Sequence, residues 1–208
     1  MRDVYDFAKF FIKNGADSSP NTYDGNMKLQ KLLVFADLAN IAEYGEPLFG
    51  DQVLAFKNGC VVEKVRLRYK NDYVAFYNDS KSYQPDFSER EYEILRLILD
   101  IFGNATAKEL SEINHTFSFW KSAFINGTSS TGYHDKEQSV VDMMSQESDL
   151  NRMREIISAY KETSSEVESS ETINGVTFFF DGFVLTDDLM DQLEQFSLSA
   201  EEDAYSVY

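Results

Sequence analysis

Apolar residues recur at helical spacing along most of the chain. Residues 3–13 place an apolar side chain at every third or fourth position, and residues 27–44 carry an apolar face wide enough to pack on several sides. Gly45 and Pro47 end this second segment, because glycine accepts the left-handed backbone of a helix end and proline cannot continue a helix. The pattern predicts a helical core in which residues 27–44 form the central helix.

Two capping boxes predict where further helices begin. Ser88 is followed three residues later by Glu91, and Thr106 is followed in the same way by Glu109. Each pair can satisfy the free N–H groups of a first helical turn. Helices are therefore expected after both positions, and a third short helix is expected over residues 118–125.

Other segments give weaker patterns. We expect a loop over residues 15–26 and a short strand over 52–57, which a turn dipeptide follows. Four-residue spacing of apolar side chains favours a helix over residues 61–69, and residues 135–162 are expected to supply one or two further helices.

The C-terminal part differs in composition from the rest. Two turn dipeptides flank an apolar run, which predicts a β-hairpin, and a short helix is expected after it. The predicted fold is mostly α, a compact multi-helix domain with minor β and a C-terminal hairpin and helix. The predicted division is a helical domain over 1–127, additional helices packed on it over 128–162, a linker over 163–171, and an acidic, aromatic-rich extension over 172–208.

Charge is distributed unevenly along the chain. The formal net charge is −17; residues 1–161 hold 24 acidic and all 19 basic residues, whereas residues 162–208 hold twelve acidic residues and no basic one. The helices over 88–127 are spaced like a helix-turn-helix, but they carry six acids and four bases, the wrong balance for reading DNA. A protein partner with a basic surface fits better than nucleic acid. A plain solubility tail is the alternative.

Catalytic motifs are absent from the sequence. Two histidines and one cysteine are too few for an ordinary zinc site, and no phosphate-binding glycine loop or nucleophile elbow is present. Cys60 and His115 are the one nucleophile-base pair worth naming, with a small buried thiol beside a hydrogen-bonded histidine as the plainer interpretation. We therefore predict no catalytic, cofactor-binding or metal-binding residues. With no signal peptide and no membrane helix recognised, we expect a cytoplasmic protein.

The segment MKLQKLLVFADLANIAEYGEPLF, residues 27–49, is similar to the signature of the Panacea domain, also called the SocA-like antitoxin domain. The residues that match the family, called the signature residues below, are Lys28, Leu29, Gln30, Lys31, Leu32, Leu33, Tyr44, Gly45, Pro47, Leu48, Phe49, Gly59, Val61, Val62, Leu110, Ser111, His115, Trp120 and Lys121. Cys60 and Phe119 stand where the family has proline. The resemblance covers roughly residues 1–127.

The resemblance implies a bacterial or prophage antitoxin that neutralises a cognate protein toxin by direct binding. A protease-delivery adaptor and a DNA-binding regulator are the alternatives, and the oligomeric state is left open. We expect the acidic and aromatic residues of the extension to contact the toxin. These candidate partner-binding residues are Phe178, Phe180, Phe183, Asp187, Asp188, Asp191, Glu194, Glu201, Glu202, Asp203, Tyr205 and Tyr208. The aromatic side chains would supply apolar anchors and the carboxylates would face a basic surface.

Overall fold

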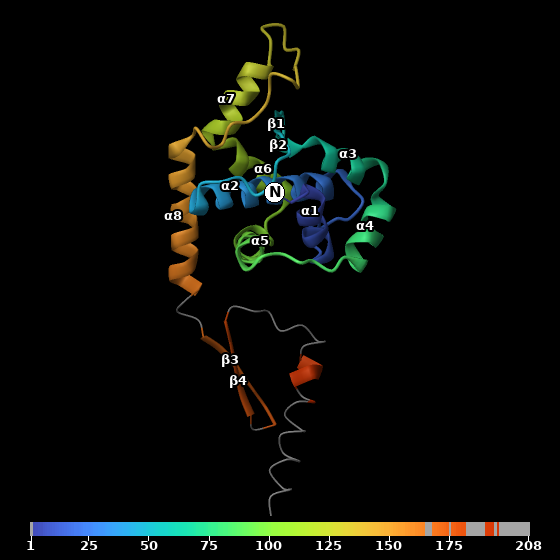
Figure 1. Ribbon diagram of the computed structural model, residues 1–208, viewed down its shortest axis with the longest axis vertical. Coiled ribbons are helices and arrows are strands. Elements are labelled where there is room, and N and C mark those ends of the chain that lie inside the picture. The colour runs from blue at the N-terminus through green and yellow to red at the C-terminus, as the bar shows by residue number, and fades with distance from the viewer. Residues whose placement is uncertain (1, 165–167, 175, 182–189, 194, 196–208) are drawn as a thin grey trace, which may run out of the picture. The chain divides into compact units, whose positions relative to one another are not determined.

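The computed structural model describes residues 2–164, 168–174, 176–181, 190–193 and 195, which contain eight helices and two β-hairpins (Figure 1). The helices are α1 (Val4–Lys13), α2 (Tyr23–Tyr44), α3 (Glu63–Asn71), α4 (Tyr73–Ser82), α5 (Glu89–Phe102), α6 (Ala107–His115), α7 (Ser118–Gly127) and α8 (Glu147–Ser164). The strands are β1 (Val53–Phe56), β2 (Gly59–Val62), β3 (Glu168–Ile173) and β4 (Val176–Asp181). The chain divides into two compact units, Met1–Ile157 and Ser158–Tyr208.

Helix α2 is the centre of the first unit, and α1, α5 and α6 contact it (Figure 1). Every residue from Lys28 to Ala42 is buried, so this helix is covered all round, as its wide apolar face predicted. It begins at Tyr23, earlier than expected, because the Thr22 hydroxyl accepts a hydrogen bond from the Gly25 N–H at 3.1 Å. The loop predicted over residues 15–26 therefore extends too far, because its last four residues belong to α2.

Both predicted capping boxes form, at the starts of α5 and α6. Earlier in the chain, one expectation is wrong and one helix was not expected at all. Val61 and Val62 belong to strand β2, and the helix that follows starts only at Glu63. Helix α4 was not expected, because Phe76 and Ser80 are its only buried residues and leave a weak apolar pattern.

Strands β1 and β2 form an antiparallel hairpin in which Phe56 pairs with Gly59 across the turn. The outer edge of β1 is covered by a segment that was expected to be helical. The Ala55 N–H donates to the Ser139 carbonyl at 2.8 Å, and the Val141 N–H donates to the Val53 carbonyl at 2.9 Å. The prediction of helix from residue 135 is therefore wrong for this stretch, and α8 begins at Glu147.

The second unit contains the β3–β4 hairpin and a helical turn at residues 190–193. The expected linker over 163–171 is partly structured, since α8 runs to Ser164 and β3 begins at Glu168. Residues 163–171 are mostly polar or charged, and this composition is the reason why a linker was expected there.

The loop that follows α2 is bound to the buried side of that helix. The Leu48 N–H donates to Asp37 Oδ1 at 2.7 Å, and the Asn40 side-chain amide donates to the Glu46 carbonyl at 2.7 Å. Gly45 takes the left-handed conformation, with φ +75°, that lets the chain turn back. The Tyr-Gly-x-Pro-Leu-Phe part of the signature thus forms the end of α2 and the loop after it, and side chains of α2 bind backbone groups of that loop.

Replacing Asp37 with alanine should cost stability in a pH-dependent way. The Leu48 N–H would lose its acceptor, at a cost of about 1–3 kcal/mol. Burial raises the pKa of Asp37 from 3.8 to about 7, so the folded state holds a proton that the unfolded chain releases between these values. The stabilisation that Asp37 contributes is therefore complete below the unfolded pKa and is lost as pH rises through about 7.

We expect the difference in unfolding free energy between the wild type and Asp37→Ala to be larger in mildly acidic than in mildly alkaline buffer. Urea titration followed by circular dichroism measures both. A difference that stays constant, or that grows towards alkaline pH, would contradict a raised pKa for this carboxyl group.

Candidate functional site

The outer edge of β2 is bound by polar side chains from α2 and α6. The Lys31 ammonium donates to the Cys60 carbonyl at 2.9 Å, and the Cys60 N–H donates to Asn114 Oδ1 at 2.8 Å. The Val62 N–H donates to Gln30 Oε1 at 2.9 Å. An edge strand normally leaves these backbone groups to water or to another strand. Here the signature residues Gln30 and Lys31 replace that neighbouring strand.

Gly59 allows this close approach. Its φ is +94°, in the region that favours glycine. A Cβ at this position would lie 2.5 Å from Asn114 Oδ1 and 2.6 Å from Lys31 Cε, well inside contact distance. The glycine of the signature is therefore required by both its backbone conformation and the side chains packed on it.

The other lysine of the helical signature is also buried. Lys28 Nζ donates to the Gly103 carbonyl at 2.6 Å and lies 2.9 Å from Ser18 Oγ, which joins α2 to the end of α5. Burial lowers the pKa of Lys28, and it lowers that of Lys31 to about 8. Leu29 lies in the core at 0% exposure. These signature side chains therefore hold the domain together, and they are not free to meet a partner.

The histidine and tryptophan of the signature belong to a row of stacked rings. His115 lies over Trp120 with ring centroids 4.0 Å apart, Trp120 stacks on Phe124 at 5.2 Å, and Phe124 stacks on His134 at 5.2 Å. Trp120 also donates its indole N–H to the Phe56 carbonyl at 2.9 Å, which ties α7 to β1. Burial is the main cause that lowers the pKa of His115, and the positive charge of Lys31 lowers it further.

Cys60 is unsuited to the nucleophilic role considered from sequence. It is fully buried in β2, and burial raises the pKa of its thiol to about 12. At neutral pH the sulfur is therefore protonated and shielded from substrate. Its position just after a turn had suggested exposure, but the edge it belongs to is covered by α2 and α6.

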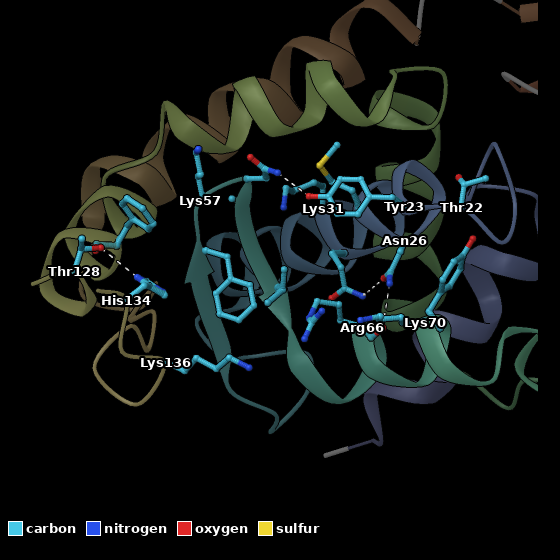
Figure 2. A pocket seen from close by; sticks show the side chains of 18 of the residues that line it. Thr22, Tyr23, Asn26, Lys31, Lys57, Arg66, Lys70, Thr128, His134 and Lys136 are labelled. Carbon is cyan, nitrogen blue, oxygen red and sulfur yellow. Dashed lines mark hydrogen bonds between the residues drawn. The ribbon is translucent and has the colours of Figure 1, made fainter. Parts of the chain in front are cut away.

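A pocket of about 740 Å³ lies beside the covered edge of β2, on the same face as Lys31. Its walls come from three separated segments: the start of α2 with the loop before it, the hairpin turn with α3, and the end of α7 with the loop that follows (Figure 2). Gln30, Lys31 and Gly59 contribute to the lining, so the signature residues build part of this pocket as well as the hairpin edge.

The lining of this pocket is basic, although the protein as a whole is acidic. Its basic residues are Lys31, Lys57, Arg66, Lys70 and Lys136, and no aspartate or glutamate lines it. Arg66 and Lys136 share the neighbouring carboxylate of Glu63, each at 2.6 Å, and hold its pKa below the usual range. A positive excess therefore remains within the pocket.

The sequence did not reveal this pocket. Its basic residues are far apart along the chain and follow no motif, so only folding brings them together. One signal was present: Lys31 lies with other polar residues in a helix whose apolar side chains cover more than one face, so some of these polar groups must be buried with specific partners.

The candidate partner-binding residues lie in the second unit. Phe178 and Phe180 stand two positions apart on β4, opposite Glu171 and Ser169 on β3. Asp191 is exposed in the helical turn. The remaining candidates fall outside the described residues; they are Phe183, Asp187, Asp188, Glu194, Glu201, Glu202, Asp203, Tyr205 and Tyr208.

The fold and the site define a mostly helical protein in which the buried side chains of Gln30, Lys31 and Asn114 cover a hairpin edge beside a basic pocket. Residues 29–121, somewhat less than half of the chain, match the family model described as "Antitoxin SocA-like, Panacea domain". The match confirms the resemblance read from the signature residues. No curated protein and no solved structure matches the chain.

Two further features of the described residues bear on function. No three histidine, cysteine, aspartate or glutamate side chains gather there as a metal site would require. Among the helices of the same residues, none is both long and apolar enough to cross a membrane.

Proposed function

We propose that this protein is the antitoxin of a bacterial or prophage toxin–antitoxin system and neutralises its toxin by direct binding in the cytoplasm. The observation that carries the proposal is the match of residues 29–121 to the family model of the SocA-like antitoxin domain. The chemistry of the site agrees with it. Cys60 is protonated and buried, and the signature lysines donate to backbone carbonyls within the domain.

The acidic second unit supplies the toxin contacts in this proposal. Residues 162–208 hold twelve acidic residues and no basic one, so they would attract a basic surface and speed association with it. The aromatic residues among them would provide the buried anchors on which affinity depends. Among the described residues, the main hydrophobic core lies within the first unit, so we expect this unit to fold without the extension.

A chain that ends at Ser164 tests this division of roles. We expect the truncated protein to unfold cooperatively, with a melting temperature close to that of the full chain, because the core is intact. We also expect it to lose the toxin. The measurement is growth rescue and co-purification after co-expression with the product of the adjacent reading frame.

A full-length control replaces residues 165–208 with a glycine-serine segment of equal length, which keeps the bulk but removes the acids and aromatics. It should fail in the same way. Rescue by either variant would place the decisive contact in the first unit. An adjacent product that does not harm growth on its own would contradict the antitoxin proposal itself.

A further inference from the structure

The basic pocket of the first unit has the features of a binding site for a small anion that carries a flat ring. Its volume of about 740 Å³ falls within the range of roughly 300–1,000 Å³ that is usual for small-molecule sites. Five basic residues and no acidic one line it, in a chain with a net charge of −17. The charge of this lining is therefore opposite in sign to that of the whole chain.

Two of these cations are available to a ligand. The side chains of Lys57 and Lys70 are exposed and form no ion pair with the described part of the chain. Lys70 and Arg66 lie on the same side of the pocket, and Lys136 reaches towards it from the loop after α7 (Figure 2). Lysine and arginine side chains can hold the oxygens of a phosphate chain.

Aromatic rings from three segments line the same pocket. Phe56 lies edge to face with His134, at a centroid distance of 5.8 Å, and Phe124 stacks on His134. Tyr23 is 67% exposed, and its hydroxyl accepts a hydrogen bond from the Asn58 amide at 2.6 Å, which holds the ring at the pocket mouth. An exposed ring such as that of Tyr23 can stack on any of the nucleobases.

One polar atom in this aromatic wall lacks a partner. His134 Nδ1 lies 3.1 Å from the Thr128 hydroxyl, whereas His134 Nε2 is buried and has no hydrogen-bond partner among the described residues. Solvent does not reach this nitrogen, so it belongs to the packed interior of the wall and is not a contact for a ligand in the pocket.

We propose that this pocket binds a free nucleotide, with the base against Tyr23 and the Phe56–His134 wall and the phosphates at Lys70, the cation on the Arg66 side of the pocket that forms no ion pair with the described part of the chain. The ligand class follows from the pairing of a basic lining with exposed rings. An acidic peptide segment would use the cations but would leave the rings unexplained. The proposal concerns the first unit alone and does not depend on the toxin.

The test uses the full chain and its single tryptophan. Trp120 stacks on Phe124, which lines the pocket, so a base bound there should alter its fluorescence. We would titrate adenine and guanine mono-, di- and triphosphates, the parent nucleosides, inorganic phosphate, pyrophosphate and an oligoglutamate peptide, by calorimetry and fluorescence. We expect saturable one-to-one binding of at least one nucleotide, and weaker binding of its nucleoside and of phosphate alone.

Variants localise the binding. Lys70→Glu should weaken nucleotide affinity by tenfold or more, since it turns an attraction for phosphate into a repulsion. Tyr23→Ala should weaken it by roughly fivefold through lost stacking, with little effect on pyrophosphate. Lys108→Glu is the matched control: this lysine is 86% exposed on α6, outside the pocket, and the change should alter affinity less than about twofold. Circular dichroism would verify that all three variants are folded.

Several results would overturn the proposal. These are the lack of saturable nucleotide binding up to roughly 1 mM, equal effects of Lys70→Glu and Lys108→Glu, and pyrophosphate binding as tight as that of any nucleotide. Tight binding of oligoglutamate without nucleotide binding would assign the pocket to an acidic protein segment instead.

Discussion

Replacing Gly59 with alanine should destabilise the first unit by roughly 3 kcal/mol or more, one of the largest losses expected for any single substitution in this chain. Two costs combine. A non-glycine residue at φ +94° is strained by about 1–3 kcal/mol. The new Cβ would also lie 2.5 Å from Asn114 Oδ1 and 2.6 Å from Lys31 Cε. Neither side chain can move away without breaking its hydrogen bond to the backbone of Cys60.

Urea unfolding and the melting temperature of the two alanine variants separate these costs. For a protein of this size, 3 kcal/mol corresponds to a decrease in melting temperature of roughly 6–12 °C. Gly132 supplies the matched control, because its φ is +82° but a Cβ there would meet no atom within 4 Å. Gly132→Ala should therefore lose only about 1 kcal/mol. Equal losses for the two variants would show that crowding by Lys31 and Asn114 is not what requires glycine.

The hairpin edge explains why part of this fold could be predicted from sequence and part could not. The capping boxes at Ser88 and Thr106 involve residues three positions apart, so the sequence contains both partners. The burial of α2 was equally visible, because its apolar residues cover more than one face. Strand β2 was missed because only four residues form it and its outer edge binds side chains from α2 and α6.

The pocket could not be predicted from the sequence, for a related reason. Tyr23, Phe56 and His134 belong to segments separated by more than thirty residues each, and no spacing rule connects them. The resemblance to the Panacea domain identified Gln30 and Lys31 as important but not what they do. Their role depends on backbone groups of β2, and a motif of side chains does not describe those groups.

Substitution of Lys31 should separate its structural role from its charge. Lys31→Ala removes a side chain that is almost fully buried at the centre of the first unit, and it should cost on the order of 3–4 kcal/mol through the cavity and the unpaired Cys60 carbonyl. Lys31→Met retains most of the volume and loses only the ammonium group. The unpaired carbonyl costs about 1–3 kcal/mol, but relief from burying a charge offsets much of this at neutral pH.

The two Lys31 variants should also differ in how their losses depend on pH. Burial lowers the pKa of Lys31 from 10.5 to about 8, so between these values the unfolded chain binds a proton that the folded protein has released. Wild-type stability attributable to Lys31 therefore rises with pH from about 8 to 10.5. We expect Lys31→Met to lose at most about 2 kcal/mol at pH 7 and to fall further behind the wild type in alkaline buffer.

This comparison bears on the pocket as well as on the fold, because Lys31 lines the pocket and also donates to the Cys60 carbonyl. Unfolding free energies of the wild type and Lys31→Met, measured by urea titration near pH 7 and near pH 9.5, give the structural term and its pH dependence. A gap that does not widen with pH would mean that Lys31 titrates as an exposed lysine does. A Lys31→Met protein that is folded at pH 7 then shows whether the buried charge attracts an anion into the pocket, because its nucleotide affinity can be measured without a loss of structure.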